Sequence, residues 1–76
     1  MTFQLPDGTS GEFSLILYDM LGRQVRSLMK GAAEPGYYSY HWDGRDDNGT
    51  LVGSGVYIYF LRAGDQNAAR KMIKLQ

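Results

Sequence analysis

Ten glycines stand singly along this chain of 76 residues, between apolar segments of strand length rather than in one flexible linker. Glycine adopts positive φ without steric cost and therefore marks turns between regular elements. No segment of helical length carries apolar residues at a period of 3.6. The chain is therefore predicted to form one all-β domain over residues 1–76, an antiparallel β-sandwich of six to seven short strands. The expected strands cover residues 2–5, 12–19, 23–30, 37–42, 56–62 and 68–75.

Alternation within the second and third segments predicts which side chains enter the core, because successive side chains of a strand point to opposite faces. The inward set of the second segment is Phe13, Leu15 and Leu17. In the third segment Val25 and Leu28 are three residues apart. Strict alternation forbids this spacing and a β-bulge allows it, so we expect a bulge there.

Residues 37–42 are almost all aromatic, and their side chains alternate in the same way. Tyr38, Tyr40 and Trp42 share one parity and are predicted to point inward. Residues 56–62 are apolar on both faces, which is typical of a central strand covered on both sides. Residues 63–67 are predicted to form a hairpin loop.

Composition argues against several classes of function. Eight basic residues balance eight acidic ones, so no net field attracts nucleic acid or an anionic membrane. Cysteine is absent, which excludes disulfides and thiolate zinc sites. No apolar run is long enough to span a membrane. The first residues also lack the pattern of a secretory signal. If this domain comes from an exported protein, we therefore expect the chain to be a fragment without that protein's signal. A domain of this size buries only about 60% of the surface of its unfolded chain, which leaves little room for an enclosed active site.

Ser39, His41 and Asp43 supply the residue types of a hydrolase triad on one strand face. Residues two apart on a strand are separated by roughly 6.5 Å, whereas a triad needs direct hydrogen bonds of about 3 Å. Residues 53–55, Gly-Ser-Gly, precede a predicted strand, whereas a phosphate-binding loop opens a helix. No catalytic or cofactor-binding residue is therefore predicted, and the chain is not expected to be an enzyme.

The acidic stretch WDGRDDNG after residue 41 allows two interpretations. Asp43, Asp46 and Asn48 could gather around a calcium ion, although their spacing fails the EF-hand pattern. Aspartate and asparagine also cap their own backbone amides, so the same residues make an ordinary turn. The turn is favoured, and calcium stays the alternative.

Three basic residues near the C-terminus, Arg70, Lys71 and Lys74, have no interleaved aromatic platform of the kind that binds single-stranded nucleic acid. They are better explained as charges that protect an edge strand against unwanted pairing.

Three stretches, LYDMLGRQVRSL, GYYSYHWDGRDDNGTLVGSGVYIYFLRAG and RKMIKL, together resemble the FlgD-like immunoglobulin-fold domain. Domains of this type are similar to the C-terminal sorting domains of type IX secretion cargo. The resemblance implies a seven-stranded immunoglobulin-like sandwich without catalytic residues, recognised by outer-membrane secretion machinery. The positions that match the family pattern are Gly22, Trp42, Ser54, Gly55, Val56, Tyr57, Lys71, Met72 and Ile73.

Two departures from the pattern concern the outer face. Ile16 and Phe60 are large and apolar where such domains often carry polar residues. If Leu15 and Leu17 face the core, Ile16 and Tyr18 face out; if Tyr57, Tyr59 and Leu61 face the core, Ile58 and Phe60 face out. Together these outward side chains form a set that we call the apolar patch: Ile16, Tyr18, Ile58 and Phe60. Burying each such side chain is worth roughly 1.5–3 kcal/mol, so we expect the patch to contact another copy or the preceding domain of the parent protein. The alternative is that residues 31–36 fold over it.

The leading functional hypothesis is a non-catalytic C-terminal sorting or assembly module of a bacterial secreted or cell-surface protein. One alternative is a self-assembling subunit of an extracellular filament or of an assembly resembling the flagellar hook cap. Another is a carbohydrate-binding module, in which aromatic side chains would stack on sugars. The aromatic residues considered for stacking are Tyr37, Trp42, Tyr57 and Tyr59.

Overall fold

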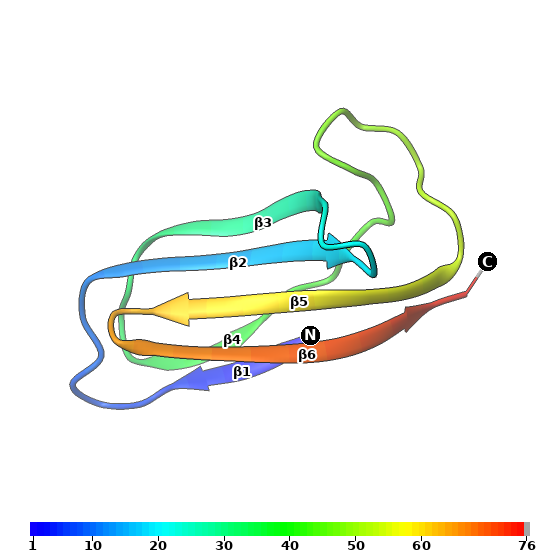
Figure 1. The fold of residues 1–76 in the computed structure, drawn as a ribbon. Helices are drawn as coiled ribbons and strands as arrows, with labels where there is room; N and C mark the ends of the chain where they lie inside the picture. The colour runs from blue at the N-terminus through cyan, green and yellow to red at the C-terminus, as the bar shows by residue number, and fades with distance from the viewer. Residues whose placement is uncertain (76) are drawn as a thin grey trace.

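The computed structural model describes residues 1–75 and contains six strands and no helix among them (Figure 1). The strands are β1 (Thr2–Leu5), β2 (Glu12–Asp19), β3 (Gln24–Ala32), β4 (Gly36–Ser39), β5 (Gly55–Ala63) and β6 (Gln66–Lys74). Over this part of the chain nothing helical is long and apolar enough to cross a membrane. The predicted all-β class is confirmed, with six strands.

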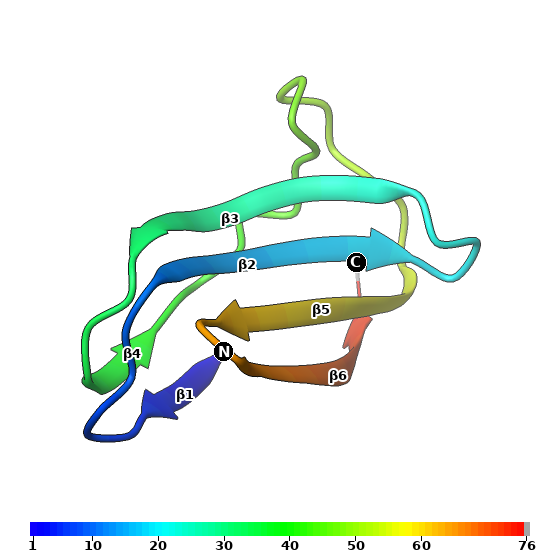
Figure 2. The ribbon, with the colours of Figure 1, turned by 60° about the vertical axis from the view of Figure 1, so that its left-hand side comes forward.

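The strands form two antiparallel sheets of unequal size. The larger sheet has the order β3-β2-β5-β6, and the smaller one pairs β1 with β4. Figure 2 shows β1 and β4 together as a second layer that faces one end of the larger sheet. As predicted, β5 is a central strand, since it pairs with β2 on one side and β6 on the other. Its outer face is not covered as predicted, because Ile58 and Phe60 stay partly exposed.

The core lies between the two layers and is centred on β2. Leu15 and Leu17 are completely buried, with Phe13 beside them at 5% exposure. Phe13 stacks with Phe3 of β1 and Tyr38 of β4 at ring-centroid distances of 5.7 and 5.8 Å. This aromatic stack joins the layers. The buried core consists of Leu5, Phe13, Leu15, Leu17, Val25, Leu28, Trp42, Tyr57 and Ala63.

β3 deviates from regular pairing at two points. The register with β2 shifts between Leu15 and Ile16 and again between Leu17 and Tyr18. Leu28 and Val25 are the residues skipped in the ladder, and both are buried. The predicted bulge is therefore confirmed, because an extra residue at each shift allows both side chains to face the core.

The predicted strand ends differ from those observed by at most two residues, except at the end of the aromatic strand. The aromatic strand ends at Ser39 rather than Trp42, because β1 offers a partner over only four residues and the last rung is the hydrogen bond from the Tyr40 amide to the Met1 carbonyl. The inward direction of Tyr38, Tyr40 and Trp42 is nevertheless confirmed, since all three pack in or against the core.

The hairpin loop predicted over residues 63–67 is only two residues long, because β5 and β6 pair as far as Ala63 and Gln66. Gly64 makes this possible. It adopts a φ of +59°, and its amide donates to the Glu12 carbonyl. A Cβ built on Gly64 would collide with the backbone oxygen of Ser10, so the tight turn needs glycine there.

We predict that Leu17→Ala lowers the free energy of unfolding by about 2–5 kcal/mol, because it leaves a cavity at the centre of a close-packed core. Urea denaturation followed by tryptophan fluorescence measures the change. Ile73→Ala is the matched control, since Ile73 is 67% exposed, and we expect less than about 0.5 kcal/mol there. Equal effects of the two substitutions would contradict the assigned core.

Candidate functional site

The connection between β4 and β5 carries the acidic stretch and is anchored by Trp42. The indole is 9% exposed and packs edge-on against Tyr57 of β5, with ring centroids 5.4 Å apart. Its Nε1–H donates to the Arg45 carbonyl at 2.9 Å. The tryptophan thus fixes the start of residues 42–52, which we call the acidic loop, to the core.

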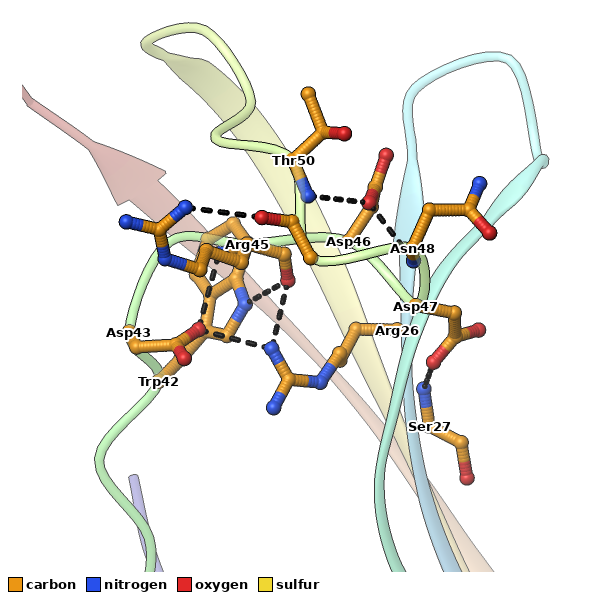
Figure 3. A network of polar contacts seen from close by, with 10 residues as sticks. Arg26, Ser27, Trp42, Asp43, Arg45, Asp46, Asp47, Asn48 and Thr50 are labelled. Atoms are coloured by element: carbon orange, nitrogen blue, oxygen red, sulfur yellow. Dashed lines mark hydrogen bonds and ion pairs between the residues drawn. The ribbon is translucent and has the colours of Figure 1, made fainter.

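Asp47 extends the loop along the open side of β3. Its amide donates to the Val25 carbonyl at 2.9 Å, and its Oδ1 accepts from the Ser27 amide at 2.9 Å (Figure 3). Its Oδ2 accepts from the Gln24 side chain at 3.0 Å. One residue therefore occupies backbone groups of an edge strand that would otherwise be available for pairing.

Asp43 holds the loop to β3 through a second contact. Its Oδ1 lies 2.8 Å from Arg26 Nη1 and also accepts from the Arg45 amide at 3.0 Å. The same Arg26 nitrogen donates to the Arg45 carbonyl at 3.0 Å. Arg26 therefore links β3 to both sides of the turn at Gly44, a buried residue with a φ of +80°.

Asp46 closes the tip of the loop on itself. Its Oδ1 accepts from the Asn48 amide at 2.9 Å and from the Thr50 amide at 3.0 Å. Its own amide donates to the Thr50 carbonyl at 2.9 Å. These are the local bonds by which aspartate stabilises turns.

Calcium fits this arrangement poorly. The Oδ1 atoms of Asp43 and Asp46 are already hydrogen-bond acceptors, and Figure 3 shows the guanidinium of Arg26 directed at Asp43. Within residues 1–75 no group of three or more histidine, cysteine or acidic side chains is arranged to hold a metal ion. The turn interpretation accounts for the bonds of Asp43, Asp46 and Asn48, and calcium binding stays a prediction that a calcium titration tests.

These contacts lower the pKa of two loop carboxyls below the ordinary value of 3.8. For Asp47 the main cause is the hydrogen bond from the Ser27 amide, followed by that from Gln24. For Asp43 the main cause is the Arg45 amide, and Arg26 adds to it. In the β2–β3 turn the Arg23 amide is the largest cause of the lowered pKa of Asp19.

The apolar patch lies on the face of the larger sheet opposite the core. Ile16 pairs directly with Phe60, and Tyr18 with Ile58, across the β2–β5 ladder. All four side chains are partly exposed. The structure therefore brings the four predicted residues together as two neighbouring cross-strand pairs.

The segment predicted to cover the patch as an alternative lies elsewhere. Gly31 and Ala32 belong to β3 and Gly36 to β4, which leaves three residues of connection. Ala33 in that connection packs against the core, and its amide donates to the Gly11 carbonyl. Residues 31–36 therefore pass to the smaller sheet and do not cover the outer face.

The other candidate residues are scattered. Ser39 ends β4, whereas His41 and Asp43 follow it outside any strand, and Asp43 is engaged by arginine. Residues 53–55 lead into β5, so a strand follows them, as predicted. The basic residues Arg70, Lys71 and Lys74 lie on β6, which is an edge strand, as predicted.

The aromatic residues considered for sugar stacking also separate. Trp42 and Tyr57 are buried, and Tyr59 packs against the core. Tyr37 alone of the four is highly exposed, at 84%. They do not form one exposed aromatic platform.

Comparison with known proteins gives one positive result. The family described as the FlgD Ig-like domain matches residues 1–67. The chain belongs to this family. No curated protein and no solved structure gives a significant match.

Membership in the FlgD Ig-like family agrees with the geometry around the residues that carried the resemblance. Trp42 is buried in this FlgD Ig-like domain, and the Gly22 amide closes the β2–β3 turn on the Asp19 carbonyl. The family and its all-β fold are typical of non-catalytic modules. Sequence reasoning missed Asp47 and Arg26, because their partners lie about twenty residues away and only the fold brings them together.

We predict that Asp47→Ala opens the edge of β3. The Ser27 amide loses its acceptor, so its hydrogen exchange, measured by NMR, becomes faster, and the melting temperature falls. Asp65→Ala is the control, because Asp65 is also an exposed aspartate but lies in the β5–β6 turn. Unchanged exchange at Ser27 would show that Asp47 does not cap this edge.

Acid is expected to destabilise the domain in a defined window. A carboxyl with a lower pKa in the folded chain contributes stability above its unfolded pKa and loses that contribution as pH falls through the folded value. Because Asp19, Asp43 and Asp47 all have lowered pKa values, unfolding free energy should decline as pH drops below the ordinary value of 3.8. Urea titrations across this range test the prediction, and a rise in stability toward low pH would contradict it.

Proposed function

We propose that this FlgD Ig-like domain is a non-catalytic sorting or assembly module of a bacterial exported protein and acts at the cell surface. The observation that supports the proposal is the apolar patch, a group of large side chains on the outer face of an antiparallel sheet, where polar side chains are usual. A surface of this kind marks a contact with another protein. The domain then works by binding rather than by chemistry.

The surroundings of the patch indicate what kind of surface covers it. Lys30 pairs with Ser14 and Lys71 with Ile58 on the outer face, and the Arg62 guanidinium lies 6.0 Å from the centre of the Phe60 ring. A hollow of about 520 Å³ beside Ile16 is lined by Lys30 and Arg62, with Glu12 as its acidic member. Cations therefore outnumber carboxylates around the patch.

This charge pattern favours secretion machinery or a neighbouring domain of the same exported polypeptide over a second copy. Two copies that met face to face would bring like charges together, and such contacts are unfavourable. A partner with an apolar surface and acidic side chains at its margin complements the patch. We therefore propose that such a partner covers Ile16, Tyr18, Ile58 and Phe60.

Export of a fused passenger tests the proposal. The domain, joined to the C-terminus of an unrelated soluble passenger in a bacterium with type IX secretion machinery, should bring the passenger to the surface, whereas the passenger alone should remain inside. Phe60→Ser should reduce surface delivery with little change in melting temperature. Leu21→Ser is the matched control, because Leu21 is 78% exposed and lies in the β2–β3 turn away from the patch.

Two results would contradict the proposal. One is a passenger that stays inside although the fused domain is folded, which removes the sorting role. The other is equal delivery by Phe60→Ser and the unsubstituted domain, which removes the patch. Light scattering of the isolated domain tests whether a second copy covers the patch instead. Oligomers that form with rising concentration and that Phe60→Ser abolishes would identify a second copy as the partner.

A further inference from the structure

The two layers do not match in width, and this leaves part of the inner face of the larger sheet uncovered. Tyr59 and Leu61 of β5 and Met72 of β6 point toward the smaller sheet, yet each stays partly exposed. Their direct partners on β2 are completely buried: Leu17 pairs with Tyr59, and Leu15 pairs with Leu61. Two facing strands therefore cover β2 well and β5 and β6 poorly.

A groove runs between β1 and β6 where the covering layer ends. It contains two hollows of about 220 and 120 Å³. β1 forms one wall of both hollows, and β5 with β6 forms the floor. The residues that matter for the argument are Phe3, Gln4, Tyr59, Leu61, Ala68 and Arg70.

β1 also has a free edge along this groove. The Tyr40 amide donates to the Met1 carbonyl at 2.7 Å, and the N-terminal ammonium of Met1 donates to the Tyr40 carbonyl at 2.8 Å. Hydrogen-bonded and non-hydrogen-bonded pairs alternate along an antiparallel ladder. The peptide groups of Phe3 and Leu5 therefore also point toward β4. The peptide groups of Thr2 and Gln4 therefore turn away from β4, toward the groove, where they can bond to another strand.

The charge of the groove is positive. Arg70 pairs with Tyr59 and therefore shares its inward face, and it lines the larger hollow. Its Nη1 donates to the carbonyl of the adjacent Ala69 at 3.3 Å. Neither β1 nor β6 contains an acidic residue, so an incoming carboxylate would meet no like charge on these two strands.

We propose that β1 accepts an added strand from an acidic, extended segment of a partner protein. The segment extends the smaller sheet over β6, places alternate apolar side chains in the two hollows and sets a carboxylate against Arg70. Backbone hydrogen bonds to an exposed sheet edge supply affinity in this mode, and alternate side-chain pockets supply specificity. At the opposite edge of the larger sheet, Asp47 already occupies the Val25 carbonyl and the Ser27 amide of β3, so that stretch is not open to an added strand.

A second copy is a poorer occupant than an acidic segment. Pairing β1 with β1 would bring only threonine, phenylalanine, glutamine and leucine to the groove, and no carboxylate for Arg70. Pairing β6 with β6 about its central residue would set Arg70 against its counterpart, and like charges directly opposite each other destabilise a sheet. Both symmetric arrangements leave the basic side chains unpaired.

NMR titration with a synthetic strand tests the proposal. The probe is a blocked peptide of seven residues, with threonine at odd positions and valine, glutamate and valine at even positions. Backbone amide shifts are expected for β1 and for the groove face of β6 at peptide concentrations up to roughly 1 mM. The same peptide with lysine in place of glutamate should bind at least about fivefold more weakly, as should the glutamate peptide to Arg70→Glu.

Two further variants separate the proposed contact from general effects. Lys71→Glu changes the neighbouring charge, which lies on the opposite face of β6, and should leave affinity within about twofold. Gln4→Pro removes an amide directed at the groove and should abolish the shifts while the β2–β5 amides keep their native positions.

Several results would overturn the proposal. Shifts confined to the outer edge of β6 would show that the strand adds there instead. Equal binding of the glutamate and lysine peptides, or equal effects of Arg70→Glu and Lys71→Glu, would remove the acidic recognition. Absence of shifts at the highest concentration would remove strand addition, and concentration-dependent β1 shifts without peptide would identify a second copy as the occupant.

Discussion

The structure depends first on how Trp42 is held between the two layers. Its ring packs edge-on against Tyr57 of the central strand β5, and its indole N–H bonds to the Arg45 carbonyl. One side chain thus joins the core to the acidic loop. Because the loop is fixed at that end, Asp43 and Asp47 can reach β3, where they accept hydrogen bonds from Arg26 and from the Ser27 amide.

Most of the fold could be predicted from local pattern, and the exceptions have a common cause. Alternation identified the inward residues of β2, and the spacing of Val25 and Leu28 identified a bulge, because both signals lie within one strand. The end of β4 and the length of the β5–β6 turn depend on which strand pairs with which. In the same way, the local sequence predicted that the acidic residues form a turn. The contact of Asp47 with β3 could not be predicted, because only the tertiary fold brings the two together.

The surfaces of this FlgD Ig-like domain differ in how many backbone groups stay free at the strand edges and in how much apolar surface stays exposed. Part of the β3 edge is occupied by the acidic loop, where Asp47 bonds to the Val25 carbonyl and the Ser27 amide. The outer sheet face retains an apolar patch, and the side between β1 and β6 retains a free edge above partly covered core residues. Evenly balanced total charge conceals a local excess of cations at both of these surfaces.

Iodide quenching of the single tryptophan gives the most direct measurement of the central claim. Since Trp42 is the only indole in the chain, its fluorescence reports the junction between core and loop without interference. In the folded protein we expect weak quenching and blue-shifted emission, both lost in urea. Quenching in native buffer as strong as in urea would contradict the packing of Trp42 against Tyr57 and, with it, the loop arrangement that depends on it.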